Sequence, residues 1–200
     1  MSLLDMYISK VNTPSDINEH LTTLKKYTDQ CKIVVECGVR SVTSSYAFAI
    51  SLKGRKNVKL YQVDPSKSNE VTEFQQLCEN ELVPTEFFHQ SDLDCPLIDT
   101  DLLFIDTWHI YGQLKRELNR WNKVVSKYII MHDTTIDEWK GETIRVGWNA
   151  EEQSKDSGIP IEEINKGLWP AIEEFLVEHP EWKLKERFTN NNGLTILERV

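Results

Sequence analysis

Short apolar runs alternate with longer amphipathic segments through the first two thirds of the chain. The apolar runs are rich in β-branched and aromatic residues, which favours strands, and they cover residues 32–37, 58–64, 85–91, 101–106 and 128–133. Between them, apolar residues recur at helical spacing, which predicts helices near 15–30, 44–53, 69–82 and 114–125. Because the strands are almost continuously apolar and alternate with helices, the pattern predicts a parallel sheet with helices on both faces.

The last third of the chain follows a different pattern. Residues 134–160 contain three glycines and few periodic apolar positions, so we expect a long loop or lid with little regular structure. A helix over 161–179, interrupted near Gly167 and Pro170, comes next. Residues 181–189 and 194–200 flank an Asn-Gly turn, which is typical of a β-hairpin. The whole pattern predicts one α/β domain over residues 1–200, with an N-terminal helical segment at 1–30.

Composition narrows the class of protein. Hydrophobic residues make up 40% of the 200 residues and charged residues 28%, which suits a packed globular domain. The formal net charge of −9 argues against a nucleic-acid partner, because phosphate binding favours a basic surface. The four cysteines lack zinc-ligand spacing. With no signal-like start and no apolar stretch of about 20 residues, we expect a cytoplasmic protein without membrane contact.

Polar residues follow every predicted parallel strand. In an open parallel sheet, ligands bind at the carboxyl ends of the strands, so these residues are candidates for a site. They are Glu36 and Gly38, Asp64, Ser91 and Asp92, Asp106 and His109, and His132 and Asp133. Helix capping would explain any one of them, but it explains less well why Glu36 and Asp106 lie within or beside apolar runs. The first turn does not read GxGxxG, which disfavours a nicotinamide or flavin enzyme.

Five segments together resemble a known family. In chain order they read VVECGVRSVTSS, LYQVD, HQSDLD, DLLFIDTWHIYG and YIIMHDT, and they cover about residues 30–135. They resemble class I S-adenosylmethionine-dependent methyltransferases and, within these, the metal-dependent O-methyltransferases of the catechol and macrolide-sugar types. The resemblance implies a Rossmann-like, seven-stranded, mostly parallel sheet that ends in an antiparallel hairpin.

The resemblance also implies roles for individual residues. S-adenosylmethionine would lie against Glu36, Gly38 and Ser44 at its methionine end, Asp64 at its ribose, Ser91 and Asp92 at its adenine, and Asp106. A divalent cation, Mg²⁺ or Mn²⁺, would be held by Asp106, Asp133 and His132. His109 takes the place of the catechol type's catalytic lysine, which would make it the base, with Asp106 as its catalytic companion. The acceptor would be a hydroxyl of a small molecule or sugar.

One departure from the family keeps other functions open. Val42 stands where the family has a second glycine, so a side chain there could crowd the cofactor, or the loop could take another path. The alternatives are therefore a non-catalytic cofactor-binding protein and a metal-independent methyltransferase of an amine or protein. Trp139 and Trp148 could cover the acceptor from the predicted lid. The N-terminal helix could pair in a homo-oligomer, although nothing in the sequence specifies this.

Overall fold

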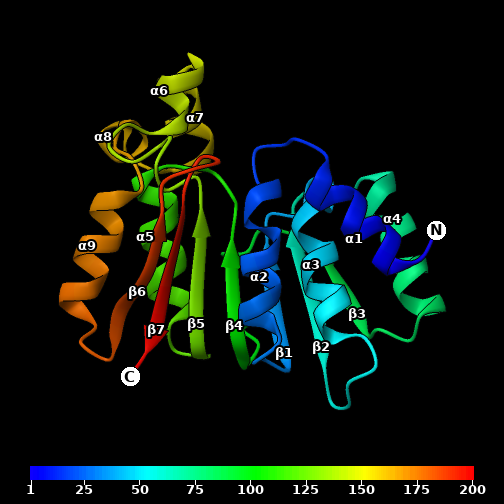
Figure 1. Ribbon diagram of the computed structural model, residues 1–200. Coiled ribbons are helices and arrows are strands. Elements are labelled where there is room, and N and C mark those ends of the chain that lie inside the picture. Colours follow the sequence, from blue (N-terminus) through cyan, green and yellow to red (C-terminus); the bar gives the residue numbers. More distant parts are fainter.

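A single mixed sheet organises the molecule. The computed structural model describes residues 1–200. The strands are β1 (Ile33–Cys37), β2 (Lys59–Asp64), β3 (Thr85–His89), β4 (Thr100–Ile105), β5 (Val125–His132), β6 (Trp182–Phe188) and β7 (Leu194–Arg199). Their order is β3-β2-β1-β4-β5-β7-β6, with β1 to β5 parallel and β7 antiparallel to both of its neighbours (Figure 1). The predicted Rossmann-like α/β sheet with its terminal hairpin is confirmed.

Both faces of the central strands are buried. Successive side chains of a strand point to opposite faces, so each central strand contributes to two cores. Leu102 and Phe104 belong to one apolar cluster, whereas Leu103 and Ile105 belong to the other. This is why the sequence of β4 reads as an unbroken apolar run.

Helices cover the two faces in separate sets. On one face lie α1 (Leu3–Asn12), α2 (Leu21–Thr28), α3 (Thr43–Leu52) and α4 (Asn69–Asn80). On the other lie α5 (Tyr111–Trp121) and α9 (Trp169–Glu178) (Figure 1). The chain therefore leaves β1 toward one face and β4 toward the other, and these two strands are neighbours. Such a reversal point is where open α/β sheets bind ligands.

The N-terminal prediction of one helix over residues 15–30 was wrong in its extent. The structure has α1 before it, then a 3₁₀ turn at Asn18–His20, and only then α2. The Ser15 hydroxyl accepts a hydrogen bond from the backbone N–H of Asn18 and so fixes the short turn instead of starting a long helix. A capping box formed by Ser2 and Asp5 begins α1, a signal that the sequence carries.

The expectation that residues 134–160 have little regular structure was also wrong. They contain α6 (Glu142–Val146) and α7 (Ala150–Ser157), and α8 (Ile161–Asn165) follows. Gly147 and Gly158 end the two helices in left-handed conformations, and Asn149 caps α7 through bonds from two backbone N–H groups. These helices, here called the α6–α8 lobe, lie above the carboxyl ends of the strands (Figure 1).

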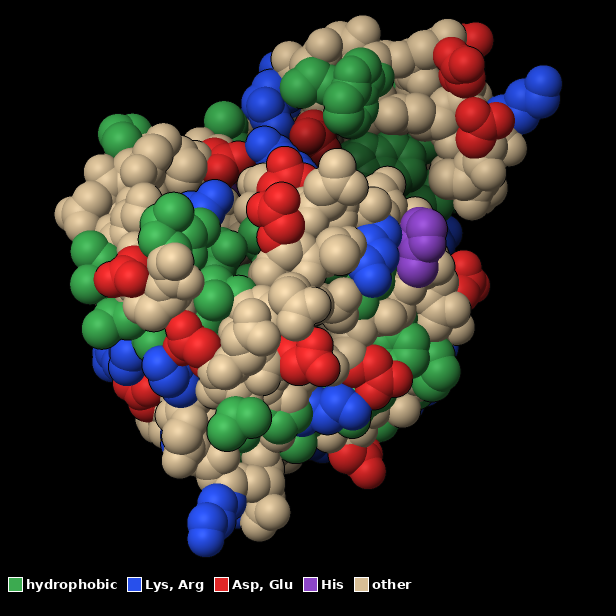
Figure 2. Space-filling model, turned by 90° about the vertical axis from the view of Figure 1, so that its right-hand side faces the viewer, with side chains coloured by type: hydrophobic (Ala, Val, Ile, Leu, Met, Phe, Trp, Pro, Cys, Tyr) green, Lys and Arg blue, Asp and Glu red, His purple; other side chains and the backbone are tan.

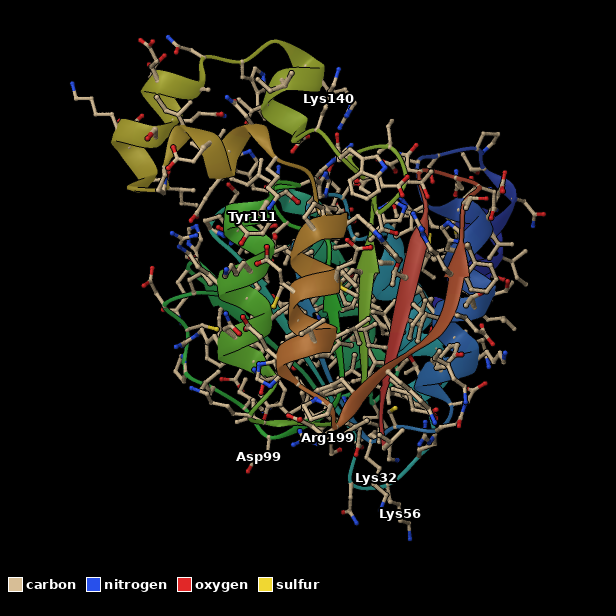
Figure 3. All side chains as sticks on the ribbon, turned by 90° about the vertical axis from the view of Figure 1, so that its left-hand side faces the viewer. Lys32, Lys56, Asp99, Tyr111, Lys140 and Arg199 are labelled. Carbon is tan, nitrogen blue, oxygen red and sulfur yellow. The ribbon has the colours of Figure 1, made fainter.

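The α6–α8 lobe connects closely to the start of α5. In Figure 3, Lys140 lies just before α6, and Tyr111, the first residue of α5, lies below the α6–α8 lobe. The backbone N–H of Tyr111 donates to the carbonyl of Lys166, and that of Glu142 donates to the carbonyl of His109. No helix in the chain combines the length and apolar character needed to cross a membrane.

Candidate functional site

Two adjoining cavities open at the carboxyl ends of the strands. The β2-side cavity, of about 430 Å³, is lined by Asp64, Ser91, Asp92, Thr107 and Gln113 among others. The β5-side cavity, of about 270 Å³, is lined among others by Ser44, His109, Asp133, Glu142 and Trp148. Gly38, Arg40, Asp106 and Thr107 line both. The shared residues follow β1 and β4, so the cavities meet at the reversal point of the sheet.

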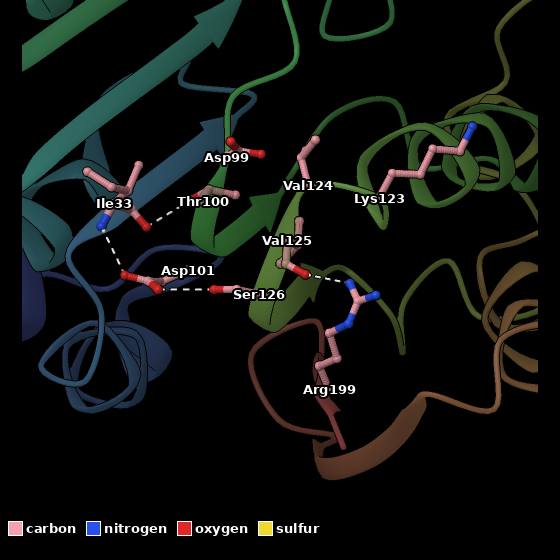
Figure 4. A pocket seen from close by; sticks show the side chains of 9 residues that line it. All are labelled: Ile33, Asp99, Thr100, Asp101, Lys123, Val124, Val125, Ser126 and Arg199. Atoms are coloured by element: carbon pink, nitrogen blue, oxygen red, sulfur yellow. Dashed lines mark hydrogen bonds between the residues drawn. The ribbon is translucent and has the colours of Figure 1, made fainter.

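A third hollow, of about 360 Å³, lies at the opposite ends of the strands (Figure 4). Arg199, which lines it, is labelled in Figure 3 at the end of the molecule away from the α6–α8 lobe. Two of its polar side chains bond within the protein. Asp101 accepts from the N–H groups of Lys32 and Ile33 and from the Ser126 hydroxyl. Arg199 donates to two backbone carbonyls. These bonds fasten strand ends together.

Asp64 and Gly38 shape the turn after β1. One Asp64 oxygen accepts from the N–H groups of Val39 (2.8 Å) and Arg40 (3.1 Å), and the other accepts from Ser66 (2.7 Å). Gly38 has φ +84°, and a Cβ there would lie 2.0 Å from the carbonyl oxygen of Asp106. Only glycine permits this approach, which brings the first turn against the end of β4.

Val42 adopts a conformation that glycine usually takes. Its φ is +56°, and it precedes the first residue of α3. A branched side chain in this region costs about 1–2 kcal/mol. The side chain is buried in the apolar core and lines neither cavity. The loop thus follows a glycine-like path with the valine turned inward, outside the lining of both cavities.

Glu36 lies behind the site and does not line it. Its side chain is fully enclosed and accepts hydrogen bonds from the hydroxyls of Ser44 (2.5 Å) and Ser45 (2.6 Å) and from the amide of Gln62 (3.1 Å). Burial raises the pKa of Glu36 to about 7, although these bonds oppose the shift. Of the three residues predicted at the methionine end, Gly38 and Ser44 line a cavity, whereas Glu36 does not and instead positions Ser44 through a hydrogen bond.

Ser91 and Asp92 reach the β2-side cavity as predicted from the strand ends. The Ser91 hydroxyl accepts from the N–H of Leu93 (3.2 Å) and so holds the loop after β3. Asp92 is almost fully buried, and one of its carboxylate oxygens accepts from the Gln113 amide (3.3 Å).

His109 sits among four carboxylates at the end of β4. Its Nε2 lies 3.2 Å from Asp106, and its Nδ1 lies 3.1 Å from Asp133. The same Nδ1 is 3.5 Å from Asp137 and 3.6 Å from Glu142. Ligand atoms of Asp106, His109 and Asp133 all lie within 4.8 Å of one another, the spacing expected around one metal ion.

His132 stands behind this cluster. Its Nδ1 lies 3.3 Å from Asp106 and 3.5 Å from Asp133, and its Nε2 contacts the carbonyl oxygen of Asn191 at 3.2 Å. Because a carbonyl only accepts, Nε2 carries a proton and Nδ1 is the nitrogen that faces the carboxylates. The arrangement brings together all four residues predicted as metal ligands or base.

Solved structures of methyltransferases resemble the chain over nearly its whole length. A Klebsiella pneumoniae protein assigned as an O-methyltransferase is 16% identical, with a TM-score of 0.61, and the match covers 98% of this chain and 89% of that one. The O-methyltransferase TomG from Streptomyces achromogenes, in complex with S-adenosylmethionine, is 12% identical, with a TM-score of 0.62 over 94% and 82% of the chains. A Podospora anserina methyltransferase with bound S-adenosylhomocysteine is 14% identical, with a TM-score of 0.57 over 99% and 87%.

The chain has the class I S-adenosylmethionine-dependent methyltransferase fold. At these identities the likeness establishes the fold. No protein-family model matches the sequence, and no curated protein matches it significantly. The position of the two cavities within this methyltransferase fold, at the reversal point of the sheet, is where such a fold binds its ligands.

The charges around His109 are strongly coupled. Burial disfavours the charged forms of Asp106 and of the two histidines. The imidazoles of His132 and His109 nevertheless hold the pKa of Asp106 well below its usual range. The carboxylates of Asp106, Asp137 and Asp133 overcome burial and raise the pKa of His109 well above that of free imidazole. In the same way, Asp106 and Asp133 raise the pKa of His132 to about 9. The cluster thus attracts positive charge, which can be a proton or a cation.

The residues present fit a divalent cation. One oxygen of Asp133 and the Nδ1 of His109 are buried without a hydrogen-bond partner. Carboxylate oxygens suit hard cations, and an imidazole in the set favours Mn²⁺ or another transition metal over Mg²⁺. A cation would compete with the proton on His109, because metal binding requires a neutral imidazole.

Sequence reasoning missed three residues of the cluster: Asp137, Glu142 and Arg145. Asp137 is fully buried and is held by Arg145 through two contacts, of 2.5 Å and 2.8 Å. Glu142 begins α6 and faces His109. They were missed because residues 134–160 were expected to form an irregular loop. The spacing of Asp137, four residues after Asp133, was the one available signal.

Proposed function

We propose that the protein is an S-adenosylmethionine-dependent O-methyltransferase of a small-molecule or sugar hydroxyl, assisted by a divalent cation. One observation carries the proposal. The β2-side cavity contains Asp64, the β5-side cavity contains His109 and Asp133, and the two cavities meet at Asp106. A cofactor across the first cavity would present its methyl group toward the second.

The β2-side cavity has the polar groups that an adenosine needs. Asp64 is fixed by three backbone N–H groups, and its oxygens keep lone pairs for the ribose hydroxyls. Asp92 and Ser91 lie farther along the same cavity, beside the proposed adenine position. Gly38 leaves room for the sulfonium end between Asp64 and Asp106. Each cofactor residue therefore keeps the role that the family resemblance implies, except Glu36, which acts by positioning Ser44.

Asp106 and Asp133 would hold the cation, with His132 against the two carboxylates. When bound, a divalent cation chelates neighbouring oxygens of an acceptor and lowers the pKa of a hydroxyl. The Nδ1 of His132 is directed at both carboxylates, so it can either ligate the cation or fix their orientation.

His109 is the proposed base. In its neutral form it can accept the acceptor's proton, and Asp106 and Asp133 then stabilise the imidazolium that forms. Alignment of the hydroxyl with the methyl group supplies the rest of the catalysis, because displacement at a sulfonium requires an in-line approach.

The acceptor would enter beneath the α6–α8 lobe. An open hollow lies there, next to the β5-side cavity. It is lined by Pro65, Trp108, Glu142, Trp148 and Gln153 among others. Figure 2 shows these helices projecting beyond the body of the molecule, with a hollow beneath them. Trp148 is 52% exposed, so its ring is available to stack on a sugar or an aromatic ring. The lobe thus supports the predicted role of a lid over the acceptor.

Calorimetric titration with S-adenosylhomocysteine, followed by a methyl-release assay with Mn²⁺ and a panel of catechols and simple glycosides, tests the proposal. We expect binding at one site, and turnover that is lost with excess chelator and in Asp133→Asn. Glu151→Gln, on the exposed surface of the lobe and outside the lining of both cavities and of this hollow, is the control and should retain activity.

Two results would contradict the proposal in different ways. Turnover that survives both the chelator and Asp133→Ala would favour the metal-independent alternative, which the pairing of His109 with two carboxylates also accommodates. Binding of S-adenosylhomocysteine without turnover on any acceptor would favour the non-catalytic alternative.

A further inference from the structure

Two buried acids meet at the wall of the β2-side cavity. Asp92 comes from the loop after β3, and Glu117 comes from α5. Both are almost completely buried, at 5% and 1% exposure. One amide nitrogen, that of Gln113, donates to both carboxyl groups, so the two acids are immediate neighbours. Asp92 also lines the cavity, together with Thr107 and Gln113.

The hydrogen bonds of this pair leave two oxygens without partners. Glu117 Oε1 accepts from the Thr107 hydroxyl (2.5 Å) and from the Gln113 amide (2.8 Å). The same Gln113 amide donates to Asp92 Oδ1 (3.3 Å). Asp92 Oδ2 and Glu117 Oε2 are buried and have no partner at all. A single proton shared by these two oxygens would satisfy both.

No cation forms an ion pair with either carboxyl group, although the charge of Arg120 favours the ionised form of Asp92. Arg120, one turn along α5, donates its hydrogen bonds to the backbone carbonyls of Asp92 and Cys95. Asp94 from the same loop adds negative charge, and the buried Cys37 of β1 lies near both acids. Two ionised carboxylates this close and this buried repel each other strongly, so one of them keeps its proton. In agreement, burial and the Asp92 charge raise the pKa of Glu117 well above its usual range.

We propose that Glu117 is a positioning residue for the adenine end of the cofactor, because it shares one proton with Asp92 and so fixes the Asp92 carboxyl at the cavity wall. The inference rests on the proposed function, in which Asp92 contacts the adenine. Sharing the proton leaves the pair with one negative charge and keeps Asp92 Oδ1, held by Gln113, available as an acceptor. Loss of that proton at high pH would push the two carboxylates apart and move Asp92 from its place.

The affinity for S-adenosylhomocysteine, measured by calorimetry between about pH 7 and pH 9.5, tests this role. We expect the wild type to lose about tenfold in affinity over this range and Glu117→Gln to lose less than about threefold. An amide in place of Glu117 can donate to Asp92 at every pH, so the variant should bind within about threefold of the wild type at pH 7. The ligand's own amino group titrates equally in both proteins and cancels in the comparison.

Glu163→Gln is the matched control, since Glu163 pairs with Arg116 on α5 but lines neither cavity. It should follow the wild-type profile. If Glu117→Gln does not fold, Asp92→Asn removes the second charge instead, and it should flatten the profile at lower overall affinity. Parallel pH profiles for the wild type and the folded variant would overturn the proposal.

A second measurement does not depend on the cofactor. In protein labelled with ¹³C at glutamate carboxyl groups, NMR at pH 7 should show a protonated Glu117 carboxyl, and this signal should vanish in Glu117→Gln. An ionised Glu117 at pH 7 would refute the shared proton. If the wild type does not bind S-adenosylhomocysteine at all, the proposed function fails and this role fails with it, whereas the NMR signal still reports whether the carboxyl pair shares a proton.

Discussion

Replacing Gly38 by alanine tests whether the close approach of two strand ends builds the site. Gly38 and Gly54 both have positive φ, at +84° and +74°. A Cβ at Gly54 meets nothing within 4 Å, whereas one at Gly38 would lie 2.0 Å from the Asp106 carbonyl oxygen. Ordinary contact begins at 3.4 Å, so the backbone at Asp106 must move. Gly54→Ala is therefore a matched control for the backbone conformation alone.

The magnitudes follow from these two environments. A left-handed alanine costs about 1–2 kcal/mol, and the smaller entropy of its unfolded chain returns about 0.4–1 kcal/mol. Gly54→Ala should therefore lower the free energy of unfolding by about 1 kcal/mol. Gly38→Ala adds an overpacking cost of about 1–3 kcal/mol, for a total of about 2–4 kcal/mol. For a domain of this size the losses in Tm are about 2–4 °C and about 4–16 °C, respectively.

Thermal unfolding followed by circular dichroism measures the stability difference, and calorimetry with S-adenosylhomocysteine measures the effect on the site. Gly38→Ala should weaken binding by at least about tenfold, because Asp106 lines both cavities and moves with its backbone. Gly54→Ala should bind like the wild type. Equal losses of stability in the two variants, with unchanged affinity in both, would refute the reasoning.

Three further predictions concern residues around the site. Val42→Gly should leave the affinity for S-adenosylhomocysteine within about twofold of the wild type. It should lower the free energy of unfolding by about 1 kcal/mol, because about 2 kcal/mol of lost burial outweighs the relieved backbone strain. A large gain in affinity, measured by calorimetry, would contradict the inward position of the Val42 side chain. Because burial raises the folded-state pKa of Glu36 to about 7 from 4.5, its contribution to stability should fall by about 3 kcal/mol as pH rises from 4.5 to 7; denaturant titrations should show this loss in the wild type but not in Glu36→Gln. Asp137→Asn should lower the pKa of His109 in an NMR titration, and an unchanged pKa would remove Asp137 from the cluster.

The sheet was predictable because its signals are local. Continuous apolar runs such as β4 predict burial on both faces, and the Asn-Gly turn before β7 predicts the hairpin. The carboxyl-end rule then placed Asp64, Asp106 and Asp133 at one edge without further information. All three line the cavities.

The rest depended on contacts between distant segments. The α6–α8 lobe was missed because α6 and α8 have only five residues each and gain their order from contacts with α5 and with each other. Asp137 was missed for the same reason, since only folding brings it to His109. The conformation of Val42 was equally hidden, because a left-handed valine contradicts local preference and is held in place by its burial.

Titration of the wild type with S-adenosylhomocysteine, beside Asp64→Asn and the exposed-lobe control Glu151→Gln, tests the central claim most directly. Binding at one site per chain that is weakened at least about tenfold by Asp64→Asn and unchanged in Glu151→Gln is the predicted result. The absence of binding to the wild type, or equal binding by all three proteins, would contradict a cofactor site at the carboxyl ends of β1, β2 and β4.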